Sequence, residues 1–217
     1  MPLADELTAT VEHVREALPA HIFSDIQQAT VDLGRTDLVA CAAGIGARPH
    51  LPSLPDATGT PVDLAGLLAR GPLVLTFYRG GWCPYCNVAL QALQRVLPDI
   101  RALGAELVAV TPELADRIET TAGRIETDFP VLHDAHNAFA RTLGLVFELP
   151  EAVRAHFTQI GIELPEYNGD ATFSLPVPAT YVIGRDGAVA WAFVDADFTR
   201  RAEPDDVLAA LRALPSH

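Results

Sequence analysis

Residues 77–86 read Phe-Tyr-Arg-Gly-Gly-Trp-Cys-Pro-Tyr-Cys, and they join two segments of different character. The segment before them, residues 73–78, is largely apolar and rich in strand formers, which predicts a strand buried on both faces of a parallel sheet. The segment after them, residues 84–103, predicts a helix with a kink at Pro98. Both cysteines are therefore expected at a strand-to-helix turn, one helical turn apart.

The first cysteine of the pair, Cys83, should lie at the N-terminus of that helix. Unpaired backbone N–H groups and the helix dipole favour an anion there, so we expect a lowered thiol pKa and a thiolate at neutral pH. The thiolate is the nucleophilic form of cysteine. We therefore predict that Cys83 is the exposed attacking thiol and that Cys86, one turn into the helix, is the buried resolving thiol.

The residues that flank the pair suit a sharp turn next to a reactive sulfur. Pro84 fits the first helical position, where its fixed φ is favourable. Gly80 and Gly81 allow a tight turn and leave the backbone open to a substrate. Trp82 can shield one flank of the sulfur. These residues, together with Arg79, are candidate site residues.

The rest of the chain alternates between predicted strands and helices. The predicted strands cover residues 106–111, 130–132, 180–183 and 188–194, and the predicted helices cover residues 63–69, 113–125, 135–143 and 204–214. An Asp-Gly turn at residues 185–187 joins the last two strands into a hairpin. This order of elements predicts an α/β fold with three layers.

Three regions fall outside this alternation. Residues 1–43 read as a helical N-terminal extension, and residues 44–217 as the α/β domain. Residues 44–61 are rich in Gly and Pro and predict irregular chain with turns. Residues 146–178 form a long insertion before the hairpin, which is either a functional lid or interface element or a surface decoration.

Composition limits the classes of partner and of chemistry. The chain has 217 residues and a net charge of −13, from 15 basic and 28 acidic residues, which argues against nucleic acid or an anionic membrane as a partner. All fifteen basic residues are arginine. The absence of lysine excludes a Schiff-base lysine, a pyridoxal phosphate anchor and a Walker P-loop. Since no apolar run can span a bilayer and the N-terminus lacks a secretory pattern, we expect a cytoplasmic protein, and we expect no cofactor.

A zinc site is the alternative interpretation of the cysteine pair. Zn²⁺ needs four ligands, and the third cysteine, Cys41, is remote in the sequence. His133 and His136 could complete a site on paper, but they lie much farther from Cys86 than in a compact zinc finger. Cys41 lies in an apolar stretch, so we expect a buried small side chain, with a third redox role or an intersubunit disulfide as alternatives.

The cysteine segment and three later segments together resemble a known family. Residues 77–86 are followed by Leu-Val-Ala-Val-Thr-Pro-Glu (107–113), Phe-Pro-Val-Leu-His-Asp (129–134) and Val-Pro-Ala-Thr-Tyr-Val-Ile-Gly-Arg-Asp-Gly (177–187). This pattern is similar to the peroxiredoxin-like branch of the alkyl hydroperoxide reductase and thiol-specific antioxidant family. The resemblance covers about residues 46–194. It implies a thioredoxin-like three-layer fold with a central mixed sheet, preceded here by the helical extension.

The resemblance also implies a reaction and the roles of three residues. In the family, a peroxidatic cysteine thiolate attacks the O–O bond of a hydroperoxide and becomes a sulfenic acid. A resolving thiol then forms a redox-active disulfide, which a thioredoxin-like reductant reduces. By position, Cys83 matches the peroxidatic cysteine and Cys86 the resolving one. Pro178 matches the cis-proline that faces the pair in thioredoxin folds, so the Val177–Pro178 bond is expected to be cis.

The sequence departs from the family around the nucleophile. Typical members carry a proline seven residues and a threonine three residues before it, where this chain has Thr76 and Gly80. Pro178 stands where the family has an arginine that polarises the peroxide. Arg79 is the candidate substitute, and a surface arginine is the alternative interpretation.

Three further polar residues are weaker candidates. Arg200 and Arg201 follow the hairpin and are possible substitutes for the family arginine. Glu113 could approach the cysteines in place of the buried aspartate of thioredoxins, or it could be a helix N-terminal acid.

The sequence supports three hypotheses in a fixed order. The first is a thiol peroxidase that reduces hydroperoxides through the Cys-x-x-Cys pair and is re-reduced by a thioredoxin-type donor. The second is a general thiol–disulfide oxidoreductase acting on protein disulfides, which the missing threonine and arginine favour. The third is a non-catalytic zinc-binding module. The N-terminal helices and the insertion are plausible dimer elements, so a homodimer is a further expectation.

Overall fold

A five-stranded sheet forms the centre of the protein, whose computed structural model describes residues 1–119 and 127–215. The strand order is β5-β4-β3-β8-β9, with β3 and β4 parallel, β4 and β5 parallel, and β8 antiparallel to both β3 and β9. The strands are β3 (Leu73–Phe77), β4 (Glu106–Thr111), β5 (Val131–His133), β8 (Ala179–Ile183) and β9 (Val189–Val194). All five residues of β3 are buried, as the apolar run predicts. The expected mixed sheet is confirmed.

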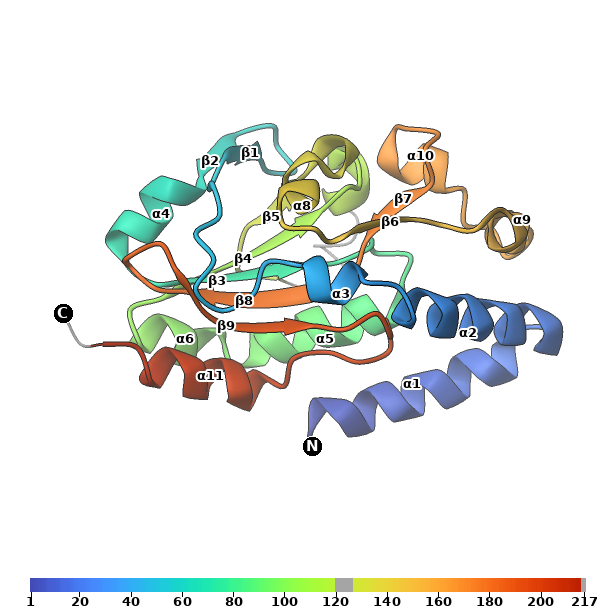
Figure 1. Cartoon of the computed structure of the whole chain (residues 1–217), viewed down its shortest axis with the longest axis horizontal. Helices are drawn as coiled ribbons and strands as arrows, with labels where there is room; N and C mark the ends of the chain where they lie inside the picture. Colours follow the sequence, from blue (N-terminus) through green and yellow to red (C-terminus); the bar gives the residue numbers. More distant parts are fainter. Residues whose placement is uncertain (120–126, 216–217) are drawn as a thin grey trace.

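Helices cover both faces of this sheet and make three layers (Figure 1). One face carries α5 (Pro84–Arg95), α6 (Leu97–Ala102) and α11 (Pro204–Arg212). The other face carries α4 (Leu64–Arg70) and α8 (Ala138–Thr142), which follows a short 3-10 turn, η1 (Ala135–Asn137). Side chains of β3 alternate between the two cores: Val74 belongs to the first, whereas Leu75 and Phe77 belong to the second. The period of two along a strand produces this division.

Some element boundaries differ from the sequence predictions. The helix predicted over residues 84–103 breaks at Val96, so Pro98 lies in the first turn of α6 rather than at a kink within one helix. Residues 115–119 of the helix predicted at 113–125 are helical, and residues 120–126 lie outside the described part. Residues 44–61 are not wholly irregular, because β1 (Ser53–Pro55) pairs antiparallel with β2 (Pro61–Asp63).

The N-terminal residues form helices, as predicted. These are α1 (Leu3–Ala17), α2 (Ala20–Gly34) and α3 (Leu38–Cys41). Helix α1 packs against α5, and the Glu203 carboxylate accepts hydrogen bonds from the backbone N–H groups of Leu3 and Ala4, at 3.0 and 2.7 Å. Glu203, which precedes α11, therefore satisfies the free donors at the start of α1. The prediction for Cys41 was wrong: the side chain is exposed, because it ends a short surface helix with no buried residue.

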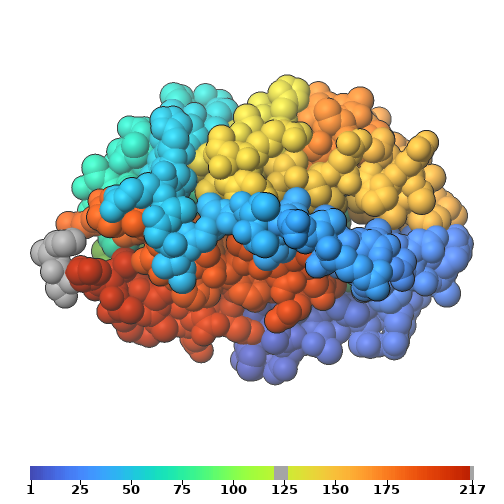
Figure 2. Space-filling model, in the orientation of Figure 1, coloured from blue at the N-terminus to red at the C-terminus, as the bar shows by residue number. Residues whose placement is uncertain are grey.

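The insertion at residues 146–178 is an ordered unit packed against the N-terminal helices. It contains β6 (Val146–Glu148), α9 (Glu151–Gln159), α10 (Leu164–Asn168) and β7 (Ser174–Pro176). Strands β6 and β7 pair antiparallel and close the base of the excursion. Helix α9 packs against α2, and the two lie side by side in Figures 1 and 2. His156 Nε2 of α9 lies 2.8 Å from Asp25 Oδ2 of α2.

The peptide bond before Pro178 is trans, which corrects the expectation of a cis bond. The chain runs from β7 into β8 in an extended form, and the Val177 N–H donates to the Leu145 carbonyl at 2.7 Å. No tight turn is required there, so the ordinary trans preference holds. Among the described residues, no helix has the length and apolar character needed to cross a bilayer.

Candidate functional site

The cysteine pair lies where the sequence places it, at the turn from β3 into α5. Cys83 is the N-cap residue of α5, with φ −91° and ψ 110°, and Pro84 begins the helix. The Cys83 carbonyl accepts hydrogen bonds from the N–H groups of Cys86 and Asn87, at 3.1 and 3.2 Å. The side-chain amide of Asn87 donates to the Gly81 carbonyl at 2.9 Å and ties the loop to the helix. The predicted helix N-terminus at Cys83 is confirmed.

Gly80 is the residue of this loop that no other type could replace. Its φ is +149°, a region that side chains disfavour. A Cβ atom there would meet Trp82 Nε1 at 2.3 Å and Glu113 Oε1 at 2.9 Å. The close approach of the indole to the backbone therefore depends on this glycine.

Both sulfurs are buried, which corrects the prediction that Cys83 is exposed. Cys83 and Cys86 each have 0% exposure. Trp82, next to Cys83, packs edge-to-face on Phe157 of α9 at 5.4 Å between ring centroids. The insertion and the N-terminal helices therefore cover the turn, and neither is adjacent to the cysteines in the sequence.

Arg79 is a buried partner of Cys83 and not a surface arginine. Its side chain has 4% exposure, and Nη2 donates a hydrogen bond to Cys83 Sγ at 3.2 Å. Its guanidinium carbon lies 3.9 Å from the ring centroid of Phe198 and 5.1 Å from that of Trp82. The aromatic faces stabilise the charge that burial would otherwise disfavour.

A second arginine, Arg201, contacts the second cysteine. Its Nη2 donates to Cys86 Sγ at 3.3 Å, and Nη1 donates to the carbonyl oxygens of Phe198 and Arg200. Arg200 points elsewhere and pairs with Asp195 at 2.8 Å. Each sulfur of the pair thus has its own guanidinium. The sequence named Arg201 only as a weaker candidate, and its position after the hairpin was the sole signal.

The two thiols are coupled through a hydrogen bond and have opposite pKa shifts. Burial raises the pKa of Cys83 well above its usual value, and the hydrogen bond to Cys86 adds to this effect. Burial opposes ionisation of Cys86 as well. The hydrogen bond with Cys83 and the charges of Arg201 and Arg79 outweigh it and hold the pKa of Cys86 well below its usual value.

The expected lowering of the Cys83 pKa is therefore wrong for that residue. The sequence argument considered the helix N-terminus but not the desolvation of a fully buried sulfur. The pair keeps one proton between two sulfurs, and its titration belongs to the pair as a whole. One negative charge flanked by two guanidinium groups is the arrangement that the contacts favour.

The remaining candidates divide between the site and other contacts. Glu113 is buried at 0% exposure close to Gly80. Burial and the charge of Glu113 together raise the pKa of Tyr78. His133 Nδ1 lies 2.6 Å from the Glu113 carbonyl, and His136 Nδ1 lies 3.2 Å from Asp170 Oδ2. Within the part of the chain that is described, no group of three metal-ligating side chains occurs. The two histidines therefore do not complete a zinc site with the cysteines.

An apolar cavity of about 280 Å³ adjoins Arg79, and we call it the Arg79 cavity. Helix α2 and the insertion line it together with Phe198. A smaller cavity of about 70 Å³ shares Arg79, Phe157 and Phe198 with it and also contacts Trp82 and Pro84. The cavities therefore meet at the residues that cover Cys83.

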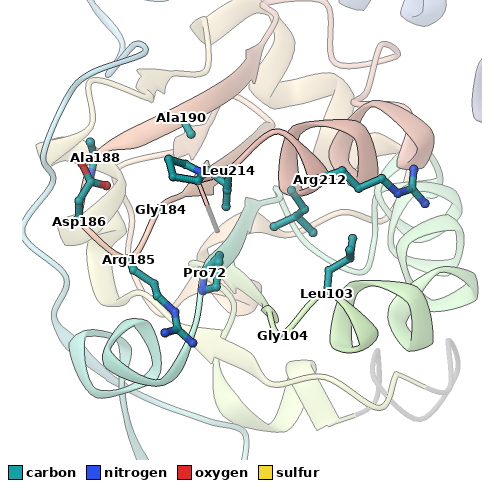
Figure 3. A pocket seen from close by; sticks show the side chains of 12 residues that line it. Pro72, Leu103, Gly104, Gly184, Arg185, Asp186, Ala188, Ala190, Arg212 and Leu214 are labelled. Carbon is teal, nitrogen blue, oxygen red and sulfur yellow. The ribbon is translucent and has the colours of Figure 1, made fainter. Parts of the chain in front are cut away.

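A larger pocket lies away from the cysteines (Figure 3). It measures about 650 Å³ and is lined by residues that include Pro72, Gly104 and Gly184. Pro72 precedes β3, whereas the cysteines follow the other end of that strand. The pocket therefore lies at the opposite edge of the sheet and does not contribute to the cysteine site.

Comparisons with known proteins agree on one family and one fold. The family model described as the AhpC/TSA family matches residues 48–192. A curated protein of Mycobacterium tuberculosis named "Putative peroxiredoxin" is 28% identical over 163 residues, which cover 75% of this chain and 92% of that protein.

Two solved structures illustrate the likeness of fold. Peroxidoxin BcpB of Mycobacterium tuberculosis matches with a TM-score of 0.63 and 25% identity, over 80% of this chain and 99% of that chain. The bacterioferritin comigratory protein of Xanthomonas campestris matches with a TM-score of 0.60 and 20% identity, over 77% of this chain and 98% of that chain.

Proposed function

The chain belongs to the AhpC/TSA family, and on that premise we propose that it is a thiol peroxidase that reduces hydroperoxides through Cys83 and Cys86. The contact from Arg79 Nη2 to Cys83 Sγ at 3.2 Å is the observation that carries the proposal. A guanidinium held at a buried sulfur stabilises a thiolate and can polarise a peroxide that enters beside it. Arg79 thereby takes the place of the family arginine that the sequence lacks.

Cys83 is the attacking sulfur in this proposal. Its partner Arg79 lines the Arg79 cavity, whereas Cys86 lies farther along α5 among buried residues such as Leu90. The proton that the two sulfurs share can move to Cys86, which leaves the thiolate on Cys83. The neighbouring residues Gly81, Trp82 and Pro84 shape the turn, and Pro178 lies beside the end of β3 in the register that pairs Phe77 with Ala179.

The reaction consumes one hydroperoxide and oxidises the pair. The Cys83 thiolate attacks the terminal oxygen, an S–O bond forms as the O–O bond breaks, and the leaving oxygen takes a proton from solvent. The Cys86 sulfur then attacks the sulfenic sulfur, a disulfide forms, and the hydroxide that leaves becomes water. A thioredoxin-like dithiol reduces the disulfide and restores the pair. Arg201 stabilises Cys86 as the thiolate that attacks in the second step.

Turnover of hydrogen peroxide and an organic hydroperoxide with a thioredoxin–reductase couple tests this function. The expected product of one equivalent of peroxide is a Cys83–Cys86 disulfide, located by peptide mass spectrometry. Cys83→Ser should be inactive, and Cys86→Ser should accumulate a sulfenic acid on Cys83. Normal turnover of Cys86→Ser with a dithiol reductant would remove Cys86 from the resolving role.

The alternative function, exchange with protein disulfides, separates in the same experiment. It predicts fast reduction of a protein disulfide and peroxide oxidation no faster than that of a free thiol. A cytoplasmic location and a homodimer remain sequence predictions.

A further inference from the structure

We propose that the Arg79 cavity binds the organic group of an uncharged, apolar hydroperoxide, and that the protein prefers such a substrate both to hydrogen peroxide and to hydroperoxides that carry a carboxylate. This inference rests on the proposed function and names the substrate class of the same site.

Two segments that the core fold does not need build the walls of this cavity. Helix α2 precedes the residues that match the family model, and α9 lies in the insertion. The apolar wall residues are Ile26, Ala29 and Leu33 from the helix, and Leu149, Val153 and Phe157 from the insertion. The contact between His156 and Asp25 joins the same two helices. A hollow of about 280 Å³ therefore lies between walls of hydrocarbon.

The position of the cavity connects it to the reacting sulfur. Arg79 lines both the Arg79 cavity and the smaller cavity beside it, and it donates to Cys83 Sγ at 3.2 Å. A hydroperoxide group that binds this guanidinium comes within reach of Cys83, while its organic group stays among the apolar walls. Cys83 itself is fully buried, so the Phe198 ring, 3.9 Å from the Arg79 guanidinium carbon, must move aside as the substrate enters.

The apolar walls select against hydrogen peroxide. Removal of hydrocarbon from water provides binding free energy for an alkyl or aryl group, and hydrogen peroxide has no such group. Apart from Arg79, the cavity offers little polar surface. Binding of a large apolar group can thus be used to place the O–O bond next to the sulfur.

The charges at the cavity select against anionic substrates. Asp32 and Glu148 are its two acidic lining residues, and both are exposed. Asp32 pairs with Arg35 at 2.8 Å, and Glu148 pairs with Arg154. The chain as a whole has a net charge of −13. A carboxylate near this opening meets like charges, whereas an uncharged apolar group does not.

The chemical step is the peroxidase step with an organic leaving group. The Cys83 thiolate forms an S–O bond to the terminal oxygen, the O–O bond breaks, and the sulfur is oxidised to a sulfenic acid. The hydroperoxide is reduced to an alkoxide, which takes a proton from solvent and leaves as the alcohol. The alcohol carries the same apolar group, so it should compete with the substrate for the cavity.

The test compares kcat/KM for cumene hydroperoxide with kcat/KM for hydrogen peroxide in three proteins. In the wild type we expect the ratio to favour cumene hydroperoxide. Ala29→Phe fills the cavity from α2, and it should lower the ratio by about tenfold or more, since small changes of volume in an apolar pocket discriminate by that factor. Val31→Phe adds similar bulk to the same helix at a position that is 49% exposed, and it should leave the ratio unchanged.

Charge selection is tested with a hydroperoxide of similar size that carries a carboxylate. We expect a lower kcat/KM than for cumene hydroperoxide, with a difference that shrinks as salt is added. Equal values at low salt would contradict the charge argument.

Binding of 2-phenyl-2-propanol, the alcohol product, gives a readout that does not need turnover. We expect it to change the fluorescence of Trp82 in the wild type and in Val31→Phe, and to bind much more weakly to Ala29→Phe. Binding without any peroxidase activity would refute the proposed function but not the cavity. Fast reduction of hydrogen peroxide with no preference for cumene hydroperoxide and no binding of the alcohol would overturn the cavity proposal alone.

Discussion

Replacing Arg79 with methionine tests whether the guanidinium stabilises the Cys83 thiolate. Methionine keeps an apolar stem between Phe198 and Trp82 but loses the 3.2 Å hydrogen bond to the sulfur. A hydrogen bond to a charged group contributes about 1.5–3 kcal/mol. Because about 1.4 kcal/mol corresponds to a factor of ten, the thiolate fraction at neutral pH should fall by about 10- to 150-fold.

The assay is the rate of alkylation of Cys83 at neutral pH. It is measured by peptide mass spectrometry in a Cys41→Ser, Cys86→Ser background, so that no other thiol reacts. Arg79→Met should slow the reaction by the factor given above. Arg200→Met is the matched control, since Arg200 is 66% exposed and pairs with Asp195 rather than with a sulfur. Alkylation of Arg79→Met at the rate of its parent would refute the reasoning.

Three further predictions address the second cysteine, the pH dependence and the N-terminal helix. Arg201→Met loses the 3.3 Å contact with Cys86, so disulfide formation after oxidation of Cys83 should slow by about tenfold or more in quenched-flow mass spectrometry, and an unchanged rate would remove Arg201 from the site. Because the pKa of Cys86 lies well below the ordinary value of 9.0, the ultraviolet thiolate absorbance of the reduced protein should be present at neutral pH and disappear as the pH falls through that lowered pKa; a midpoint at the ordinary value would contradict the coupling. Glu203→Ala removes two hydrogen bonds from the start of α1 and should lower the free energy of unfolding by about 0.5–2 kcal/mol in urea denaturation, whereas an unchanged midpoint would mean that these bonds contribute nothing.

Local patterns in the sequence predicted the elements that carry the cysteines. The apolar run became β3, and Cys83 became the N-cap of α5, because strand burial and helix entry depend on neighbouring residues. The strands of the small hairpins, such as β1 and β6, span three residues each. Strands of that length contain too few positions to show an alternation, so the sequence gave no signal for them.

Contacts between distant parts of the chain decided what the sequence missed. Cys83 is buried because Phe157 and the N-terminal helices cover the turn, and local patterns do not reveal such packing. Arg201 reaches Cys86 across 115 positions of the chain. The opposite pKa shifts of the two thiols follow from that burial and from the two guanidinium groups, so they could not be predicted from the helix N-terminus alone.

Stopped-flow mixing of the reduced protein with cumene hydroperoxide tests the central claim most directly. Trp82 adjoins the reacting sulfur, so its fluorescence should report the oxidation, and Cys83→Ser provides the baseline. The account predicts oxidation much faster than that of a free thiol, with the first product a sulfenic acid on Cys83. Oxidation no faster than that of a free thiol, or an equal rate in Cys83→Ser, would contradict it.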